Sequence, residues 1–186
     1  MQRILQDDAS ALDYYQAYFN NELCFSLLRD AIPWTQNHIT VFGKTHQEPR
    51  LTAWFGPEYA YSSIKWPKRP FPDVLLEMKQ ILEQELSFEF NAVLLNYYRN
   101  GQDSMGWHRD NEHNIKQELI ASVSFGKERP FKVRNRKTKE NYEVLLGNGD
   151  LLVMHHLQEA YEHALPKSKR HSGERINLTF RNITSI

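Results

Sequence analysis

The half of the chain that follows Phe88 consists of short apolar runs divided by turns, and this pattern limits the fold more than any other feature. The runs are rich in β-branched and aromatic residues and have the length of strands, while Gly- and Asn-bearing turns separate them. The predicted strands span 90–98, 119–125, 131–134, 142–146, 151–155 and 176–180. So many short strands in one continuous stretch indicate a jelly roll.

The first half of the chain has a different pattern. A helix is expected from about Ala11 to Ala31, followed by short strands at 39–42 and 51–55. Pro72 ends the strand pattern, and apolar residues then recur at helical spacing, which predicts an amphipathic helix over 74–86. We therefore expect a mainly β, α+β fold, a double-stranded β-helix (jelly roll) with supporting N-terminal helices.

Length and composition narrow the class of protein further. A chain of 186 residues fits a single domain spanning 1–186. The single cysteine, Cys24, excludes an internal disulfide framework and predicts a buried core thiol in a reducing, intracellular compartment. No apolar run approaches the ~20 residues that span a bilayer, which argues against membrane attachment.

The triplet His108-Arg109-Asp110 carries the first chemical signal. One intervening residue places an imidazole and a carboxylate on the same side of an extended backbone, where they can share a metal. With a third ligand from a distant segment, they would form the 2-His-1-carboxylate triad of a non-haem Fe(II) oxygenase. The downstream histidines that spacing leaves open as the third ligand are His155, His156, His163 and His171.

Residues 175–181 alternate strictly, which predicts a half-buried strand with Ile176, Leu178 and Phe180 on the core face. The opposite face carries Arg175, Asn177, Thr179 and Arg181. At a rise of ~3.3 Å per residue the two arginine backbones lie roughly 20 Å apart, and the gap left by their side chains suits a five-carbon dicarboxylic acid such as 2-oxoglutarate. By the same period of two, Asn96 and Tyr98 share one face of 90–98. A solvated polar strand face is the alternative interpretation.

These segments together resemble the AlkB family of Fe(II)/2-oxoglutarate dioxygenases. The matching stretches are 96–101 (Asn-Tyr-Tyr-Arg-Asn-Gly), 108–112 (His-Arg-Asp-Asn-Glu), 175–181, 49–56 and 59–62, and the resemblance covers about 38–183. The family's distal histidine lies in a Tyr-x-His-x-x-Pro context, which 161–166 match. The resemblance therefore selects His163 as the third ligand.

The resemblance also implies roles for other residues. Fe(II) would be bound by His108, Asp110 and His163, and 2-oxoglutarate, used with O2, by Asn96, Tyr98, Arg175, Asn177 and Arg181. Glu112 matches the acidic residue that the family places against the exocyclic nitrogen of a base. Tyr59 and Tyr61 match the region that stacks on the substrate, and core packing on a short strand is the alternative for both rings.

Nucleic acid is the expected substrate class. Residues 127–139 hold seven basic groups against one acid, and 167–175 add more, so phosphate binding is expected, with solvated loops as the alternative. Phe42, in Val-Phe-Gly-Lys, resembles the hairpin of AlkB-family members that act on duplex DNA, where it would fill the gap left by a flipped base. We divide the domain into a helical N-terminal part (1–37), a nucleotide-recognition region (38–70) and a jelly-roll core (88–183).

The resemblance implies an enzyme, an oxidative demethylase that repairs N-alkylated bases in DNA by Fe(II)/2-oxoglutarate-dependent hydroxylation of the alkyl group. An RNA or protein oxygenase with the same core, or a non-catalytic module that binds alkylation damage, are the alternatives. We expect a monomer that binds alkylated DNA, duplex DNA included, or RNA, and that lies in the cytoplasm of a bacterium or the nucleus of a eukaryote.

Overall fold

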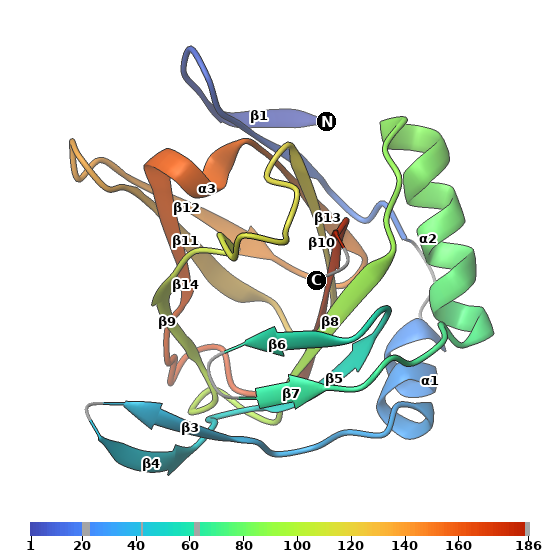
Figure 1. The fold of residues 1–186 in the computed structure, drawn as a ribbon. Helices are drawn as coiled ribbons and strands as arrows, with labels where there is room; N and C mark the ends of the chain where they lie inside the picture. Colours follow the sequence, from blue (N-terminus) through green and yellow to red (C-terminus); the bar gives the residue numbers. More distant parts are fainter. Residues whose placement is uncertain (20–22, 42, 62–63, 185–186) are drawn as a thin grey trace.

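Two sheets of antiparallel strands face each other in the computed structural model, which describes residues 1–19, 23–41, 43–61 and 64–184 (Figure 1). The larger sheet has seven strands in the order β1-β2-β13-β10-β15-β8-β5. Its strands are β1 (Gln2–Gln6), β2 (Ala11–Tyr15), β13 (Asp150–His155), β10 (Leu119–Gly126), β15 (Arg175–Arg181), β8 (Ala92–Tyr98) and β5 (Leu51–Phe55).

The smaller sheet has four strands in the order β12-β11-β14-β9. Its strands are β12 (Asn141–Leu146), β11 (Arg129–Asn135), β14 (Tyr161–Leu165) and β9 (Met105–His108), and the short helix α3 (Leu157–Ala160) precedes β14. Two separate hairpins join β3 (His38–Val41) to β4 (Lys44–Gln47) and β6 (Tyr59–Tyr61) to β7 (Ile64–Trp66). Two facing antiparallel sheets of this kind form the predicted jelly roll, so the expected fold class is confirmed.

The helices α1 (Leu23–Ala31) and α2 (Asp73–Leu86) pack side by side against the larger sheet (Figure 1). Their buried residues, among them Leu28, Leu75 and Leu82, form one apolar cluster with the outer face of β8, β10 and β15. Cys24 lies in that cluster, and burial raises the pKa of its thiol, as expected of a core cysteine. The inner face of the sheet is thereby left for a second core and for the site between the sheets.

The N-terminal helix predicted from Ala11 to Ala31 is only partly correct. Residues 11–15 form β2, which pairs with β13 so that Leu12 lies opposite Met154, and the helix α1 covers only the later part of the range. Pairing with a strand some 140 residues away overrides the local preference for helix, and no local pattern reveals such a partner. Among the described residues, no helix is long and apolar enough to cross a membrane.

Candidate active site

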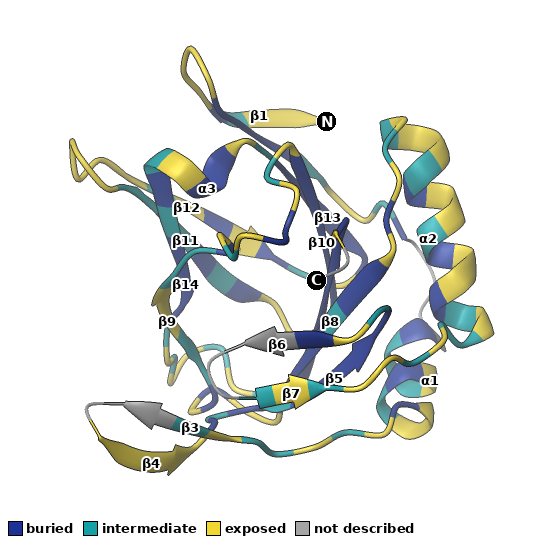
Figure 2. Cartoon of the chain, viewed as in Figure 1, coloured by how far each residue is buried: buried dark blue, intermediate teal, exposed yellow. Residues whose placement is uncertain are grey.

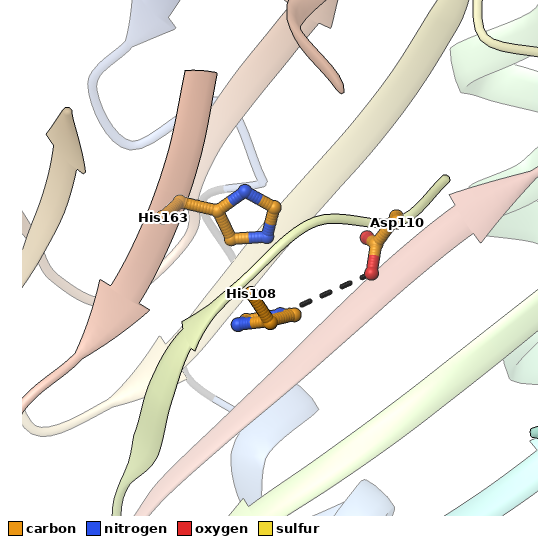
Figure 3. A group of neighbouring side chains, drawn as sticks. All are labelled: His108, Asp110 and His163. Atoms are coloured by element: carbon orange, nitrogen blue, oxygen red, sulfur yellow. Dashed lines mark ion pairs between the residues drawn. The ribbon is translucent and has the colours of Figure 1, made fainter. Parts of the chain in front are cut away.

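His108, Asp110 and His163 meet between the two sheets, and their potential ligand atoms all lie within 4.8 Å of one another (Figure 3). Asp110 and His163 are buried, and His108 is half-buried. The centroids of the two imidazole rings are 4.3 Å apart, and Nε2 of His108 lies 3.9 Å from Oδ1 of Asp110. Two imidazoles and one carboxylate in such a cluster are the donor set of the facial triad predicted for Fe(II).

Strand pairing brings these side chains together. β9 and β14 are antiparallel neighbours, and their register places His108 directly opposite His163. Asp110 follows two residues after His108, where β9 has ended. Nδ1 of His108 lies 2.8 Å from the backbone carbonyl oxygen of Gly106. A hydrogen bond donated there leaves Nε2 as the acceptor nitrogen, the arrangement that commonly orients a metal-binding imidazole.

The charges around the cluster favour metal binding at neutral pH. Burial alone would raise the pKa of Asp110, but the positive charge of Arg181 outweighs burial and holds it below its ordinary value. Arg181 donates to Oδ2 of Asp110 at 2.8 Å. Burial, together with the charge of His108, lowers the pKa of His163 to about 3. The carboxylate is therefore ionised and the imidazole neutral, which are the states that bind a metal.

Gln158, on α3, supports the segment that carries the carboxylate. Its Oε1 accepts a hydrogen bond of 2.9 Å from the backbone N–H of Asp110, and its backbone oxygen accepts one of 3.2 Å from Arg109. The Gln158 side chain is almost completely buried. Sequence reasoning missed this residue because its partner lies 48 positions away, and only the three-dimensional contact reveals it.

The polar row predicted on β15 faces the cavity. All seven residues of β15 are buried, and the register with β8 places Arg175 opposite Tyr98 and Asn177 opposite Asn96. Ile176, Leu178 and Phe180 point into the cluster below the helices, as the alternation predicted. The five residues expected to bind 2-oxoglutarate therefore lie together on two adjacent strands and line one cavity: Asn96, Tyr98, Arg175, Asn177 and Arg181.

Arg175 is a buried cation in need of an anion. Its guanidinium carbon lies 5.4 Å from the centroid of the Tyr98 ring, and one terminal nitrogen donates to Ser124 at 2.8 Å. Its Nε has no hydrogen-bond partner among the described residues. Burial lowers the pKa of Arg175 to about 10, so it still carries its charge at neutral pH. A carboxylate bound at this position would satisfy it, and the donor set therefore fits 2-oxoglutarate.

Two more of the predicted 2-oxoglutarate contacts, Arg181 and Asn177, have different surroundings. Arg181 is paired with Asp110, although its Nε is left without a hydrogen bond within the described part of the chain. The amide nitrogen of Asn177 donates to Ser122 at 2.8 Å and to the Val123 carbonyl at 3.1 Å. Both amide hydrogens of Asn177 are thus used inside the protein.

The three remaining candidate histidines lie outside the cluster. His155, the last residue of β13, has its Nε2 3.2 Å from Asp13. His156 adopts a left-handed backbone conformation before α3, with φ of 47°. Nδ1 of His171 lies 3.7 Å from Glu128. Of the four histidines that spacing left open, the structure brings only His163 to the other two ligands.

Of the four residues predicted to contact substrate, the structure describes the side chains of Tyr59 and Glu112. Tyr59 is buried and its ring stacks on Trp54 with centroids 4.5 Å apart, so one face of the ring is used in the core. Glu112 is half-buried, and burial and the charge of Asp110 raise its pKa, while the Tyr59 hydroxyl opposes that rise. The side chain of Tyr61 and the whole of Phe42 lie outside the described residues.

The basic run at 127–139 is only partly available to a ligand. Arg129 is fully buried and donates to the backbone carbonyls of residues 100, 103 and 166, which is a structural role. Arg134 pairs with Glu162 at 2.6 Å. Lys137 and Lys139 are exposed on the β11–β12 turn, which lies at the opposite end of the view from the β3–β4 hairpin (Figure 1).

A cavity of about 760 Å³, part of it open to solvent, joins these groups. Its polar wall comes from β8 and β15, and its apolar wall includes Ile64, Trp66 and Met105. The metal cluster, the buried cation and an apolar surface thus share one space.

Comparison with known proteins defines the class. The sequence pattern of the 2OG-Fe(II) oxygenase superfamily matches residues 14–181. The chain therefore belongs to this superfamily, whose Fe(II) and 2-oxoglutarate fit the donors described above. Its similarity is to the AlkB-like members, as the sequence motifs predicted.

Two relatives illustrate that similarity. The chain is 38% identical over 170 residues to the "Alpha-ketoglutarate-dependent dioxygenase alkB homolog 3" of Bos taurus, which covers 84% of this chain and 59% of that protein. It is 35% identical over 158 residues to the "DNA oxidative demethylase ALKBH2" of Bos taurus, covering 78% and 57% respectively. The chain thus spans slightly under three-fifths of each relative.

The fold has a counterpart among solved structures. The structure of OsALKBH1 superimposes with a TM-score of 0.67 over 92% of this chain and 97% of that one. Because the identity is only 13%, this likeness concerns the fold alone.

Proposed function

We propose that the protein is an oxidative demethylase that removes alkyl groups from nitrogen atoms of DNA bases. The observation that carries this proposal is the meeting, in one cavity, of a buried metal-ligand cluster and a buried arginine that lacks an anion. The similarity to AlkB-like proteins, one of which is named a DNA oxidative demethylase, supports the same conclusion.

Each group of residues has a distinct task in this proposal. His108, Asp110 and His163 would hold Fe(II), and Arg175 and Asn96 would bind and orient 2-oxoglutarate. When bound, these two supply the oxidation: O2 places one oxygen in an alkyl C–H bond of the base and the other in 2-oxoglutarate, which leaves as succinate and CO2. The hydroxyalkyl group then departs as an aldehyde when its C–N bond breaks.

The protein's own contribution to the chemistry is selection and exclusion. In this proposal Glu112 would accept a hydrogen bond from an exocyclic nitrogen of the base. Exposed basic residues on the hairpins, such as Lys44 and Lys65, would contact phosphates. We propose a monomer that acts where the cell keeps its DNA, the cytoplasm of a bacterium or the nucleus of a eukaryote.

Succinate release and loss of the methyl group, measured on a panel of methylated substrates, test the proposal. The panel holds single- and double-stranded DNA, RNA, and a methylated peptide, and Asp110→Ala serves as the inactive control. We expect turnover on DNA that depends on 2-oxoglutarate. Turnover on RNA or peptide alone would replace the substrate assignment with that of an RNA or protein oxygenase. Binding of damaged DNA without succinate release would indicate a non-catalytic module.

A further inference from the structure

A buried ion pair lies beside the predicted cosubstrate site and belongs neither to the metal cluster nor to the five residues predicted to bind 2-oxoglutarate. Glu48 and Arg50 are 2% and 5% exposed, and their side chains are 2.7 Å apart. Both line the cavity, together with Thr52 on β5. A buried pair of this kind requires desolvation of two charges, so stability alone is a weak reason for it.

The second contact of Arg50 indicates its task. Its Nε donates to Oδ1 of Asn96 at 2.8 Å. Because a guanidinium has only donors, the oxygen of the Asn96 amide must face Arg50. The amide nitrogen of Asn96 must then point the other way, and it makes no hydrogen bond to any residue that the structure describes. Asn96 therefore presents a donor to the cavity that it lines.

Asn96 differs in this respect from Asn177, which lies directly opposite on β15. The Asn177 nitrogen is already bound to Ser122 and Val123, whereas the Asn96 nitrogen is available. Of these two amides, then, only Asn96 offers a donor to a carboxylate. Without Arg50, the Asn96 amide could rotate by 180° and present its oxygen, which would repel the same carboxylate.

Glu48 in turn holds Arg50. It accepts from the terminal nitrogen of Arg50, and its backbone N–H donates to the carbonyl of Asn37 at 2.8 Å. Glu48 also cancels the charge of Arg50, so the pair adds no net positive charge to the cavity. Arg175 is then left as the cation that selects the anion.

We propose that Arg50, held by Glu48, is a positioning residue that fixes the Asn96 amide with its donor toward 2-oxoglutarate. The inference rests on the proposed function, because it takes 2-oxoglutarate as the ligand of this cavity. It assigns Arg50 an effect that acts wholly through Asn96.

A double-mutant cycle on 2-oxoglutarate binding tests that assignment. The dissociation constant is measured by calorimetry on the full chain loaded with Zn(II), without O2, for Arg50→Lys, Asn96→Ala and the double variant. Lysine keeps the charge opposite Glu48 but lacks the fork that reaches Asn96. We expect each single variant to bind 2-oxoglutarate about tenfold more weakly, the effect of one hydrogen bond, and the double variant to bind no more weakly than Asn96→Ala.

Two further variants separate positioning from stability. Glu48→Gln keeps an acceptor for Arg50 while removing its charge, and we expect a smaller loss that also vanishes in the Asn96→Ala background. If Arg50→Lys does not fold, Glu48→Gln tests the positioning role in its place. Asn91→Ala removes two hydrogen bonds to the backbone of Ile183, neither residue lining the cavity, and should lower the melting temperature without changing the affinity. Zn(II) affinity should be the same in every variant.

The outcomes are distinguishable. Losses that multiply to about a hundredfold in the double variant, or a normal affinity in Arg50→Lys, would overturn the proposal for Arg50. If the unmodified protein itself fails to bind 2-oxoglutarate, the proposed function is wrong instead.

Discussion

The floor of the cavity, formed by β8 and β15, and the β3–β4 and β6–β7 hairpins are built in different ways. β15 pairs with β8 over seven registered residues, and every residue of β15 is buried. β4, by contrast, is exposed at all four positions and, among the described strands, pairs only with β3 in a separate two-stranded sheet. Figure 2 shows the same contrast, with β4 coloured exposed and β8 largely buried.

This difference indicates that the floor holds the metal and the cosubstrate, whereas the hairpins discriminate between substrates. Groups that must be held at fixed distances from a metal need long, packed strands, because only such strands over-determine the position of a side chain. A two-stranded hairpin is marginal by itself and can move or vary in sequence at little cost. Changes in the floor should therefore affect every substrate alike, whereas changes in the hairpins should affect some substrates and not others.

The largest effect is expected from His163→Ala on β14. Removal of a metal ligand should abolish turnover on all substrates while the fold is retained, because the residue lies at the cavity and not in either apolar cluster. Succinate release measures the loss, and circular dichroism checks the fold. His155→Ala is the matched control and should keep near-normal activity; the reverse result would show that the ligand assignment is wrong.

Arg175→Leu should have the next largest effect. A cosubstrate carboxylate left without its buried partner is destabilised by on the order of 3–5 kcal/mol, which is a loss of affinity of at least about a hundredfold. The measurement is the 2-oxoglutarate concentration that gives half-maximal succinate release on two different substrates. An unchanged requirement would mean that the floor does not hold the cosubstrate.

Gln158→Leu tests whether the support of the metal site matters as much as its ligands. Leucine fills a similar volume but cannot accept the hydrogen bond from the backbone of Asp110. Loss of such an outer contact typically weakens metal affinity by about 10–100-fold. Co(II) or Zn(II) titration reports this directly, with the melting temperature of the metal-free protein as control. A Co(II) or Zn(II) affinity equal to that of the unmodified protein would remove Gln158 from the site.

Phe42→Ala tests the β3–β4 hairpin, where a change should affect some substrates and not others. If Phe42 fills the gap left by a flipped base, Phe42→Ala loses stacking worth roughly 1–3 kcal/mol and should slow the turnover of duplex substrate accordingly. The turnover rate of single-stranded substrate should be almost unchanged. The ratio of the two rates is the measurement. Equal loss on both, together with a lower melting temperature, would make Phe42 an ordinary structural residue.

The smallest effect is expected in the loop that joins β8 to β9. Buried Asp103 accepts hydrogen bonds from the backbone and side chain of Arg99. Burial would raise the pKa of Asp103, but these bonds hold it below its ordinary value. The stabilisation is therefore complete above about pH 4 and is lost as the pH falls through the lower, folded pKa.

Asp103→Asn should accordingly unfold about 1 kcal/mol more easily at pH 7. Urea unfolding at several pH values measures the difference, which should shrink in acid. A difference that is constant with pH would point to a steric cause.

The sequence predicts the side chains of the cavity floor more completely than those of the residues around it. The alternation in 175–181 predicts which side chains face the cavity, because a strand's period is independent of its partners. The choice of His163 among four histidines needed a family resemblance, since the decisive fact is the register between β9 and β14. Arg50 and Gln158 act through partners 46 and 48 positions away, and no local pattern predicts such contacts.

The strand β2 has a consequence for how the chain can be handled. β2 covers the edge of β13, and β1, with its polar Gln2, Arg3 and Gln6, forms the outermost edge of the sheet. Without residues 1–15, the unpaired backbone of β13 and its row of buried aliphatic side chains would become a template for another chain. The first fifteen residues therefore prevent self-association through the edge of β13. A version shortened to residues 14–181, the region that matches the superfamily, would be prone to aggregate.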